Sequence, residues 1–175
     1  YAPVSIDTIN FLKSNHYNLN DAIDLGVIDN GTNGLYSRFI ERITFPIYSI
    51  TAKLVGLGGR TITGHNAKYV NSPQTKLFNK SRLLYGYHLA KEQIYKKNQI
   101  IVCEGYLDVI MLHQAGFNTA VATLGTALTQ EHLPLLRRGE PKIILAYDGD
   151  KAGLAAAFKA SVMLSPSEFE GGVII

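Results

Sequence analysis

Two apolar segments that end in carboxylates constrain this chain more than any other feature. Residues 100–103 (IIVC) run directly into Glu104, and residues 143–147 (IILAY) run directly into Asp148 and Asp150. A buried β-strand that ends in an acid carries that acid to the rim of its sheet, where open α/β folds bind ligands. Two such strands side by side would gather Glu104, Asp148 and Asp150 at one sheet edge.

These acids predict chemistry on phosphates. Carboxylates crowded into a small site repel one another unless cations neutralise them. Their hard oxygens suit Mg²⁺ or Mn²⁺, ions that also hold phosphate groups. Gly105 allows a tight turn after Glu104, and Asp108 returns a further carboxylate at the start of the next helix. We interpret the set as a metal-dependent phosphoryl-transfer site, although each motif alone also fits an ordinary turn or helix N-cap.

The second half of the chain alternates strands with helices. Strands are expected at residues 99–103, 119–123 and 142–147, and helices at residues 108–114, 129–137 and 152–163. Such alternation implies βαβ units and a mostly parallel sheet. Residues 172–175 resemble the beginning of one more strand.

The first half has a mixed pattern. Helices are expected at residues 5–14 (capped by Ser5), 19–25, 35–40 and 87–95, and a β-hairpin at residues 43–48 and 54–62. Pro46 indicates an edge strand or a bulge, and residues 64–75 resemble a loop. The predicted fold class is therefore α/β. A mixed α+β subdomain at residues 1–96 is followed by a Rossmann-like subdomain with a mostly parallel sheet at residues 97–175.

The net charge of +3 conceals an uneven distribution. Residues 53–97 hold a single acid, Glu92, among the basic residues Lys53, Arg60, Lys68, Lys76, Lys80, Arg82, Lys91, Lys96 and Lys97. From residue 98 onward, acidic residues outnumber basic ones. A basic half beside an acidic half suits a polyanion that lies across both, although a solvated basic face explains the charge bias equally well.

Composition excludes several classes of protein. With 46% apolar and 18% charged residues, the chain is globular rather than disordered. No apolar stretch approaches the length of a membrane span, and the N-terminus does not resemble a signal peptide. Cys103, the only cysteine, lies in an expected buried strand, which indicates an inert thiol in a reducing cytoplasm. We expect surface or packing roles for His65, His88, His113 and His132, whose spacing does not indicate a zinc site.

Taken in order, the two acidic motifs resemble a known fold. Glu-Gly-Tyr-x-Asp at residues 104–108 and Asp-Gly-Asp-x-Ala-Gly at residues 148–153 are similar to motifs of the Toprim domain, which primases, topoisomerases and some nucleases share. Further motifs occur in the order found in bacterial replicative DNA primase, namely ERITFPI at 41–47, GGR at 58–60, KYVNSPQT at 68–75, LFNK at 77–80, LYG at 84–86 and ATLGTA at 122–127. Residues 37–163 thus resemble the catalytic core of that family, and the second subdomain is expected to be a Toprim domain.

The resemblance implies a DNA-dependent RNA polymerase. Such an enzyme makes short RNA primers de novo on single-stranded DNA for replication, by nucleotidyl transfer from ribonucleoside triphosphates. It implies that Glu104, Asp148 and Asp150 are catalytic. It also implies that these three acids, together with Asp108, bind Mg²⁺ or Mn²⁺.

Part of the basic segment matches family motifs that contact the template or the incoming nucleotide. The matching residues are Arg60, Lys68, Asn71 and Lys80. For the basic side chains from Arg82 to Lys97, solvated surface is the simpler interpretation. Tyr69 and Tyr85 can stack on bases, but packing explains them more simply.

The family has parts that this sequence does not contain. They are an N-terminal zinc-binding module, which would hold Zn²⁺, and a C-terminal domain that docks on the replicative helicase. A further acidic pair of the family lies on a strand beyond the last complete one here, so metal binding is expected to be weakened. Gln74 stands where many relatives have an acid. We expect a monomeric fragment of a cytoplasmic bacterial protein that acts at replication forks.

Three other functions remain open. A type IA topoisomerase uses the same fold, but it needs a nucleophilic tyrosine in a separate domain, which this sequence does not identify. A Toprim nuclease is a second possibility. The third is a DNA-binding module that keeps the fold without the chemistry, and the complete Glu and Asp-x-Asp set argues against it.

Overall fold

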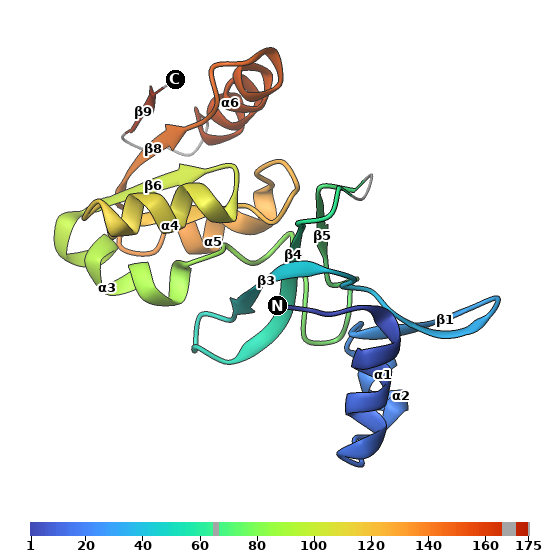
Figure 1. The fold of residues 1–175 in the computed structure, drawn as a ribbon. Coiled ribbons are helices and arrows are strands. Elements are labelled where there is room, and N and C mark those ends of the chain that lie inside the picture. The colour runs from blue at the N-terminus through green and yellow to red at the C-terminus, as the bar shows by residue number, and fades with distance from the viewer. Residues whose placement is uncertain (65–66, 166–170, 175) are drawn as a thin grey trace. The chain divides into compact units, whose positions relative to one another are not determined.

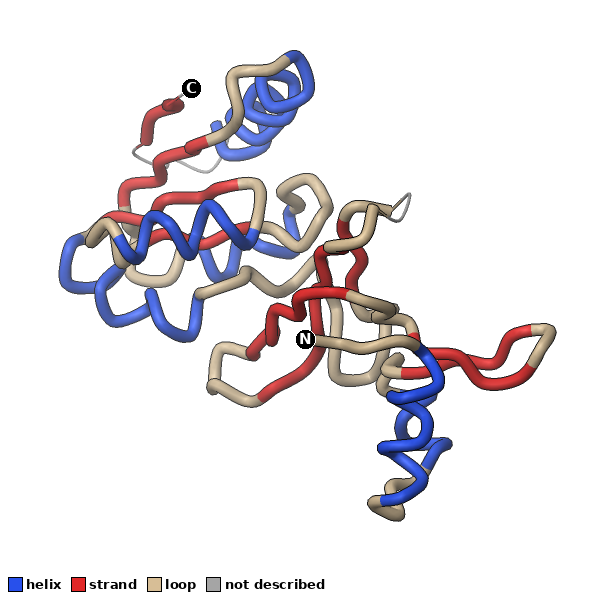
Figure 2. Tube along the Cα trace, viewed as in Figure 1, coloured by secondary structure: helices blue, strands red, loops and turns tan. Residues whose placement is uncertain are grey.

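A computed structural model describes residues 1–64, 67–165 and 171–174. The chain divides into two compact units, one formed by Tyr1–Ile47 and Leu54–Asn79 and the other by Tyr48–Lys53 and Lys80–Ile175. Both units combine helices with strands (Figure 2). The subdomain boundary expected after residue 96 stays a prediction.

The first unit packs helices against small antiparallel sheets (Figure 1). Its elements are α1 (Ser5–Ser14), α2 (Leu19–Asp24), β1 (Ile28–Gly31), β2 (Gly34–Ser37), β3 (Arg42–Tyr48), β4 (Leu54–Thr61) and β5 (Tyr69–Asn71). Strands β1 and β2 form an antiparallel hairpin, while β3, β4 and β5 form a separate sheet in that order. Helix α1 lies against β2 and α2 against β1, around the buried side chains of Ile9, Ala22 and Ile28.

Both expected N-terminal helices and the expected β3–β4 hairpin are present. Pro46 lies on β3 at the edge of its sheet, where a missing N–H removes no ladder bond on the open side. The expectation for Ser5 is wrong, because Val4 occupies the N-cap position of α1. The Ser5 hydroxyl oxygen instead accepts a hydrogen bond from the Ser37 N–H at 2.6 Å. Ser5 therefore ties α1 to β2 rather than capping the helix.

The helix expected at residues 35–40 is also wrong, since β2 covers part of that segment. Leu35 pairs with Asn30 across the β1–β2 hairpin. Two Asn-Gly dipeptides, at 30–31 and 33–34, are the hairpin signal that identifies this region, and Gly34 has the positive φ of +105° that such turns use. The short strand β5, inside the expected loop, is held by its antiparallel register with β4.

The second unit is built on a parallel sheet (Figure 1). Its elements are α3 (Tyr87–Lys97), β6 (Gln99–Cys103), α4 (Tyr106–Gln114), β7 (Ala120–Ala122), the 3₁₀ turn η1 (Gln130–His132), α5 (Leu133–Leu136), β8 (Lys142–Ala146), α6 (Lys151–Leu164) and β9 (Gly171–Ile174). The strand order is β7-β6-β8-β9, and each neighbouring pair is parallel. The expected parallel sheet and its further strand are confirmed; Ile175, at the end of the expected strand, lies outside the described residues.

Strand β6 lies inside the sheet and is covered on both faces. Ile100 and Val102 are fully buried on one side, in a core that α3, α5 and α6 share. Ile101 and Cys103 point to the other side, where Val109 of α4 packs against them. Neither face of β6 meets water, and this explains why its residues form a continuous apolar run.

The helix expected at residues 129–137 is interrupted. Pro134 lies in the first turn of α5 and has no N–H to continue an α-helical ladder back into η1, so the segment splits into a 3₁₀ turn and a short helix. Among the helices of the described residues, not one is long and apolar enough to cross a membrane.

Core packing around β8 generates a stability prediction. Leu145 is 2% exposed, so Leu145→Ala is expected to lower the free energy of unfolding by about 2–5 kcal/mol through the cavity it leaves. Leu154→Ala is the matched control, because Leu154 on α6 is 43% exposed and its loss should change stability by less than about 1 kcal/mol. Urea unfolding followed by circular dichroism measures both. Equal losses in the two variants would contradict the described core.

Candidate active site

The candidate site begins where β6 and β8 end. These strands are neighbours in parallel register, with Val102 opposite Leu145, so the residues that follow them emerge at the same sheet edge. There the Asp148 N–H donates a hydrogen bond of 2.9 Å to Glu104 Oε1. The structure thus brings Glu104 and the Asp148 backbone together, while the Asp148 residue itself is exposed.

Asp150 follows Asp148 by two residues and is the N-cap residue of α6. Its Oδ1 accepts a hydrogen bond of 2.8 Å from the Gly153 N–H, which satisfies one of the free amides of the first turn. Asp150 is therefore a helix cap as well as a candidate ligand. A helix-capping role and a metal-binding role are compatible for Asp150, because its carboxylate has a second oxygen besides the one that caps the helix.

Gly153, the last residue of the Asp-Gly-Asp-x-Ala-Gly motif, is a positioning residue whose contacts the motif alone did not show. A Cβ built on it would lie 2.2 Å from the Asp148 carbonyl oxygen and 2.8 Å from Glu104 Oε1. Only a residue without a side chain lets the first turn of α6 approach both acidic motifs this closely. A lone glycine in an alanine-rich helix, where alanine would favour the helix more, is the signal that points to such a contact.

Asp108 is turned toward the start of its own helix. Its Oδ2 accepts a hydrogen bond of 2.9 Å from the Gly105 N–H, and Gly105 is the N-cap residue of α4. The same motif therefore supplies Glu104 at the end of the strand and Asp108 one turn into the helix. Asp108 is exposed, as a group that meets a ligand from solvent must be.

Carboxylate oxygens are suitable ligands for a hard divalent cation, but the structure does not bring these side chains together into a complete metal-binding site. Within the described ranges, no three His, Cys, Asp or Glu side chains lie close enough to hold a metal ion. Glu104, Asp108 and Asp150 each give one oxygen to a backbone N–H. Each retains a second oxygen of the kind that Mg²⁺ and Mn²⁺ prefer. The four-acid metal site therefore stays a prediction.

Negative charge at this edge affects two neighbouring core residues. Burial raises the pKa of Tyr147 to about 12, and the Glu104 carboxylate adds to the rise. Burial likewise raises the pKa of the Cys103 thiol to about 12, with a further contribution from Asp108. Cys103 is free, buried and protonated at neutral pH, in agreement with the inert thiol expected from the sequence.

Two of the candidate nucleic-acid-binding cations share an aromatic ring in the first unit. The Arg60 guanidinium lies 5.9 Å and the Lys68 ammonium 6.0 Å from the centre of the Tyr69 ring. Arg60 pairs with Tyr69 across β4 and β5, and Asn71 pairs with Gly58 in the same ladder. Tyr69 is 41% exposed, so core packing alone does not account for it. Cations beside an exposed ring are typical of single-strand binding surfaces.

Tyr85 and Arg82, in the second unit, follow the simpler interpretations. The Tyr85 ring packs edge-on against Tyr106 with centroids 4.8 Å apart, and burial raises its pKa. Arg82 forms an exposed ion pair of 3.0 Å with Glu131. Lys80 also lies in this unit, and its carbonyl oxygen meets His132 Nε2 at 3.2 Å.

Arg42 is a second residue whose role the sequence analysis missed. It is 5% exposed, and its guanidinium donates hydrogen bonds to the carbonyl oxygens of Ala67 at 2.8 Å, Lys68 at 3.3 Å and Gly59 at 3.4 Å. A buried arginine is stable only when its donors are satisfied. Arg42 therefore holds the backbone that carries Lys68. A basic residue at the start of an apolar strand is the signal in the sequence.

The histidines have the expected packing roles. His132 is fully buried, accepts the Thr129 N–H at 3.0 Å through Nδ1 and faces the Lys80 carbonyl oxygen through Nε2. Burial lowers the pKa of His132, which favours the neutral ring. His113 Nε2 bonds the Ala120 carbonyl oxygen at 2.9 Å. His88 packs against a tyrosine ring, and His65 lies outside the described residues.

Comparison with known proteins identifies the family. Residues 1–91, just over half of the chain, match the family model described as DNA primase catalytic core, N-terminal domain. The chain belongs to the DNA primase family. Residues 98–171 match the Toprim domain, so the acidic motifs of this primase core lie in a Toprim sheet, and the α/β fold class is confirmed.

Primases from several bacteria are similar along almost the whole chain. The DNA primase of Helicobacter pylori strain 26695 is 60% identical over 166 residues, which cover 94% of this chain and 30% of the relative. The DNA primase of Campylobacter jejuni is 51% identical over 177 residues, which cover 100% of this chain and 29% of the relative. The chain thus spans about 30% of the length of the curated relatives it matches.

Solved primase structures have the same fold. The RNA polymerase domain of Mycobacterium tuberculosis primase matches with a TM-score of 0.88 and 35% identity, over 100% of this chain and 61% of that one. The Aquifex aeolicus primase, with zinc-binding and RNA polymerase domains, gives a TM-score of 0.89 and 34% identity, over 99% of this chain and 43% of that one. A primase catalytic domain bound to single-stranded DNA gives 0.85 and 38% identity, over 95% and 54%.

Gly153 generates a prediction for this site. Gly153→Ala is expected to lower the free energy of unfolding by about 1–3 kcal/mol, because the new methyl group overlaps the Asp148 carbonyl oxygen, 2.2 Å away. In an open helix position the same change would stabilise by up to about 1 kcal/mol. Ala155→Gly, on the exposed part of the same helix, controls for helix propensity. Chemical denaturation measures both, and a Gly153→Ala protein as stable as the parent would show that α6 does not approach the acidic motifs as described.

Proposed function

We propose that the chain is part of a primase, a DNA-dependent RNA polymerase that starts short RNA chains on single-stranded DNA from ribonucleoside triphosphates. The observation that supports it most directly is the hydrogen bond from the Asp148 N–H to Glu104, which joins the two acidic motifs at the carboxyl edge of a Toprim sheet. Membership of the DNA primase family supports the same activity.

In this proposal the acids hold Mg²⁺ or Mn²⁺. Glu104, Asp148 and Asp150 would be the principal ligands, and Asp108 would supply a supporting carboxylate. When bound, divalent cations neutralise phosphate charge and favour departure of pyrophosphate. The chain's own contribution is to set the acids on rigid elements: β6 and β8 fix Glu104 and Asp148, and the first turn of α6 fixes Asp150.

The template and the incoming nucleotide would meet the basic surface. Arg60 and Lys68 would neutralise phosphates without reading base sequence. The exposed ring of Tyr69, which lies near both cations, would stack on an unpaired base. Asn71 and Lys80 would add polar contacts to the template or the nucleotide. A solved relative described as a primase catalytic domain bound to single-stranded DNA supports a strand of this kind as the ligand.

Replacing Asp148 with Asn is expected to separate catalysis from binding. In the full-length protein, Asp148→Asn should reduce unprimed RNA synthesis on single-stranded DNA on the order of 100-fold or more, because charge stabilisation at the reacting phosphates is lost. Template affinity should persist or rise, since one like charge is removed from a polyanion-binding surface. Glu131→Gln is the matched control, as Glu131 is an exposed acid paired with Arg82.

The readout is short, alkali-labile RNA made from four ribonucleotides with Mg²⁺ or Mn²⁺. Full synthesis by Asp148→Asn would refute the site assignment. Nicking or relaxation of supercoiled DNA without primer synthesis would instead favour the nuclease or the type IA topoisomerase. DNA binding without either activity would favour the non-catalytic module.

Removing a basic side chain tests the template surface. Lys68→Ala is expected to weaken single-strand binding and to reduce the slope of log K against log salt by roughly one, since one phosphate contact disappears. Lys13→Ala removes an exposed lysine of α1 and should leave that slope unchanged. Fluorescence anisotropy of a labelled oligonucleotide across a salt series gives both slopes. Identical slopes for Lys68→Ala and the parent would place the strand elsewhere.

A further inference from the structure

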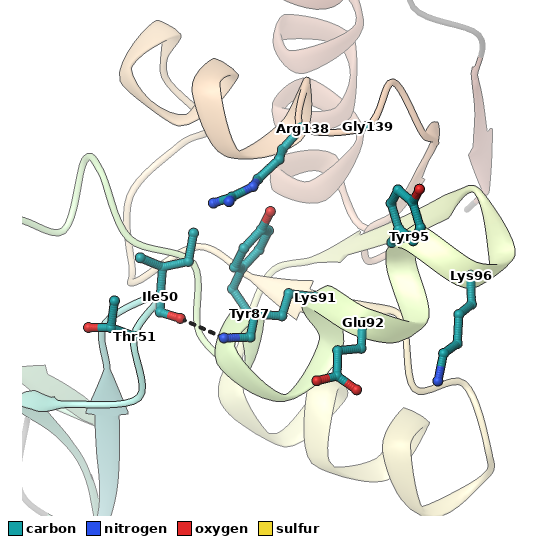
Figure 3. A pocket seen from close by; sticks show the side chains of 9 residues that line it. All are labelled: Ile50, Thr51, Tyr87, Lys91, Glu92, Tyr95, Lys96, Arg138 and Gly139. Atoms are coloured by element: carbon teal, nitrogen blue, oxygen red, sulfur yellow. Dashed lines mark hydrogen bonds between the residues drawn. The ribbon is translucent and has the colours of Figure 1, made fainter.

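A cavity of about 640 Å³ lies beside α3 in the second unit. Its walls come from α3, from the turn at Tyr48–Lys53 and from the connection between α5 and β8 (Figure 3). None of the four candidate metal-binding acids, Glu104, Asp108, Asp148 and Asp150, lines it. The volume is in the range of small-molecule sites, roughly 300–1,000 Å³. The cavity is thus large enough for a ligand of its own.

The charged side chains of this cavity are mostly cationic. Lys91 and Lys96 come from α3 and Arg138 from beyond α5, against a single acid, Glu92. Lys91 Nζ donates to the Ile50 carbonyl oxygen at 3.1 Å and retains further N–H donors. In the part of the chain that the structure describes, the side chains of Lys96 and Arg138 have no hydrogen-bond or ion-pair partner. Lys96 extends away from Arg138, on the side of Glu92, so the donors of Arg138 and Lys91 are the ones available to an anion inside the cavity (Figure 3).

Arg138 reaches into the cavity over a tyrosine. Figure 3 shows its guanidinium pointing toward the Tyr87 ring. Burial raises the pKa of Tyr87, and the Arg138 charge opposes that rise, which agrees with the closeness of the two groups. Tyr87 is 3% exposed and its hydroxyl donates to the Leu135 carbonyl oxygen at 3.1 Å. Tyr87 is thus a fixed part of the cavity wall, and the Arg138 guanidinium lies beside it.

Tyr95 supplies a different kind of wall. It is 80% exposed, so its ring contributes little to the core. The ring lies next to the backbone at Gly139, where a Cβ added to the glycine would be 3.6 Å from Tyr95 Cδ2. An aromatic ring open to water and next to cations is suited to stack on a planar base whose phosphates the cations hold.

We propose that this cavity is a second nucleotide site, which binds one nucleoside triphosphate through its phosphates at Arg138 and Lys91, which Figure 3 shows on either side of Tyr87, and through its base on Tyr95. An inorganic anion would use the cations alone and would leave the ring without a role. An extended strand needs a groove along which several bases stack, whereas this cavity has the size of a single nucleotide. The inference does not depend on primase activity, because the lining residues exclude the candidate catalytic acids.

The test measures binding rather than synthesis. ATP is titrated calorimetrically into the chain carrying Asp148→Asn, with EDTA present, so that the acids and divalent cations contribute no binding. Tyr95→Ala and Arg138→Ala are each expected to weaken ATP binding about tenfold, through lost stacking and a lost charge-assisted contact. Tyr95→Phe keeps the ring and should bind like the parent. Arg82→Ala, which removes an exposed arginine that is paired elsewhere, should also have no effect.

Two ligands separate the contributions of base and phosphate. Tripolyphosphate should bind to the parent about tenfold more weakly than ATP, because stacking is lost, and should not respond to Tyr95→Ala. Adenosine should bind more weakly still and should not respond to Arg138→Ala. Equal affinity for tripolyphosphate and ATP would reduce the cavity to an anion site and overturn the proposal. Unchanged ATP affinity in both Tyr95→Ala and Arg138→Ala, with circular dichroism confirming their fold, would overturn it entirely.

Discussion

The parallel pairing of β6 with β8 is the constraint on which the rest of the candidate site depends. Burial on both faces fixes the register of β6, because a one-residue slip would exchange the side chains that face α4 with those that face α3 and α6. Both strands then end at the same edge. Glu104 and the backbone of Asp148 are therefore held close together, and the Asp148 N–H donates a hydrogen bond to Glu104.

Backbone N–H groups hold three of the acids at this sheet edge through hydrogen bonds. Glu104, Asp108 and Asp150 each accept from an N–H of the neighbouring motif or helix turn. Each of these bonds satisfies a backbone N–H and fixes the orientation of one carboxylate. The same bonds direct the acids toward the local backbone.

The sequence predicted the second unit better than the first. Apolar runs such as 100–103 and 143–147 report burial directly, so strands and their order could be read from them. In contrast, the β1–β2 hairpin buries little, and its segment around Leu35 carries an apolar spacing that also fits a helix. Turn chemistry, not hydrophobic pattern, decides between those structures. Within the site, acid positions could be predicted from strand ends, but the contact at Gly153 could not, since it depends on the distance between α6 and the sheet.

Arg42 shows how the first unit prepares its surface. Its buried guanidinium already holds the carbonyl oxygens of Ala67 and Lys68, so this backbone is fixed when the unit folds. The conformational entropy of ordering it is lost in folding and is not lost a second time when a polyanion arrives. Binding at Lys68 is then preorganised at the level of the main chain, with only a flexible side chain left to order. A lysine in place of Arg42 would carry the same charge, yet it could not span three carbonyl groups with a planar fork, so the loop would have to find its conformation in each encounter.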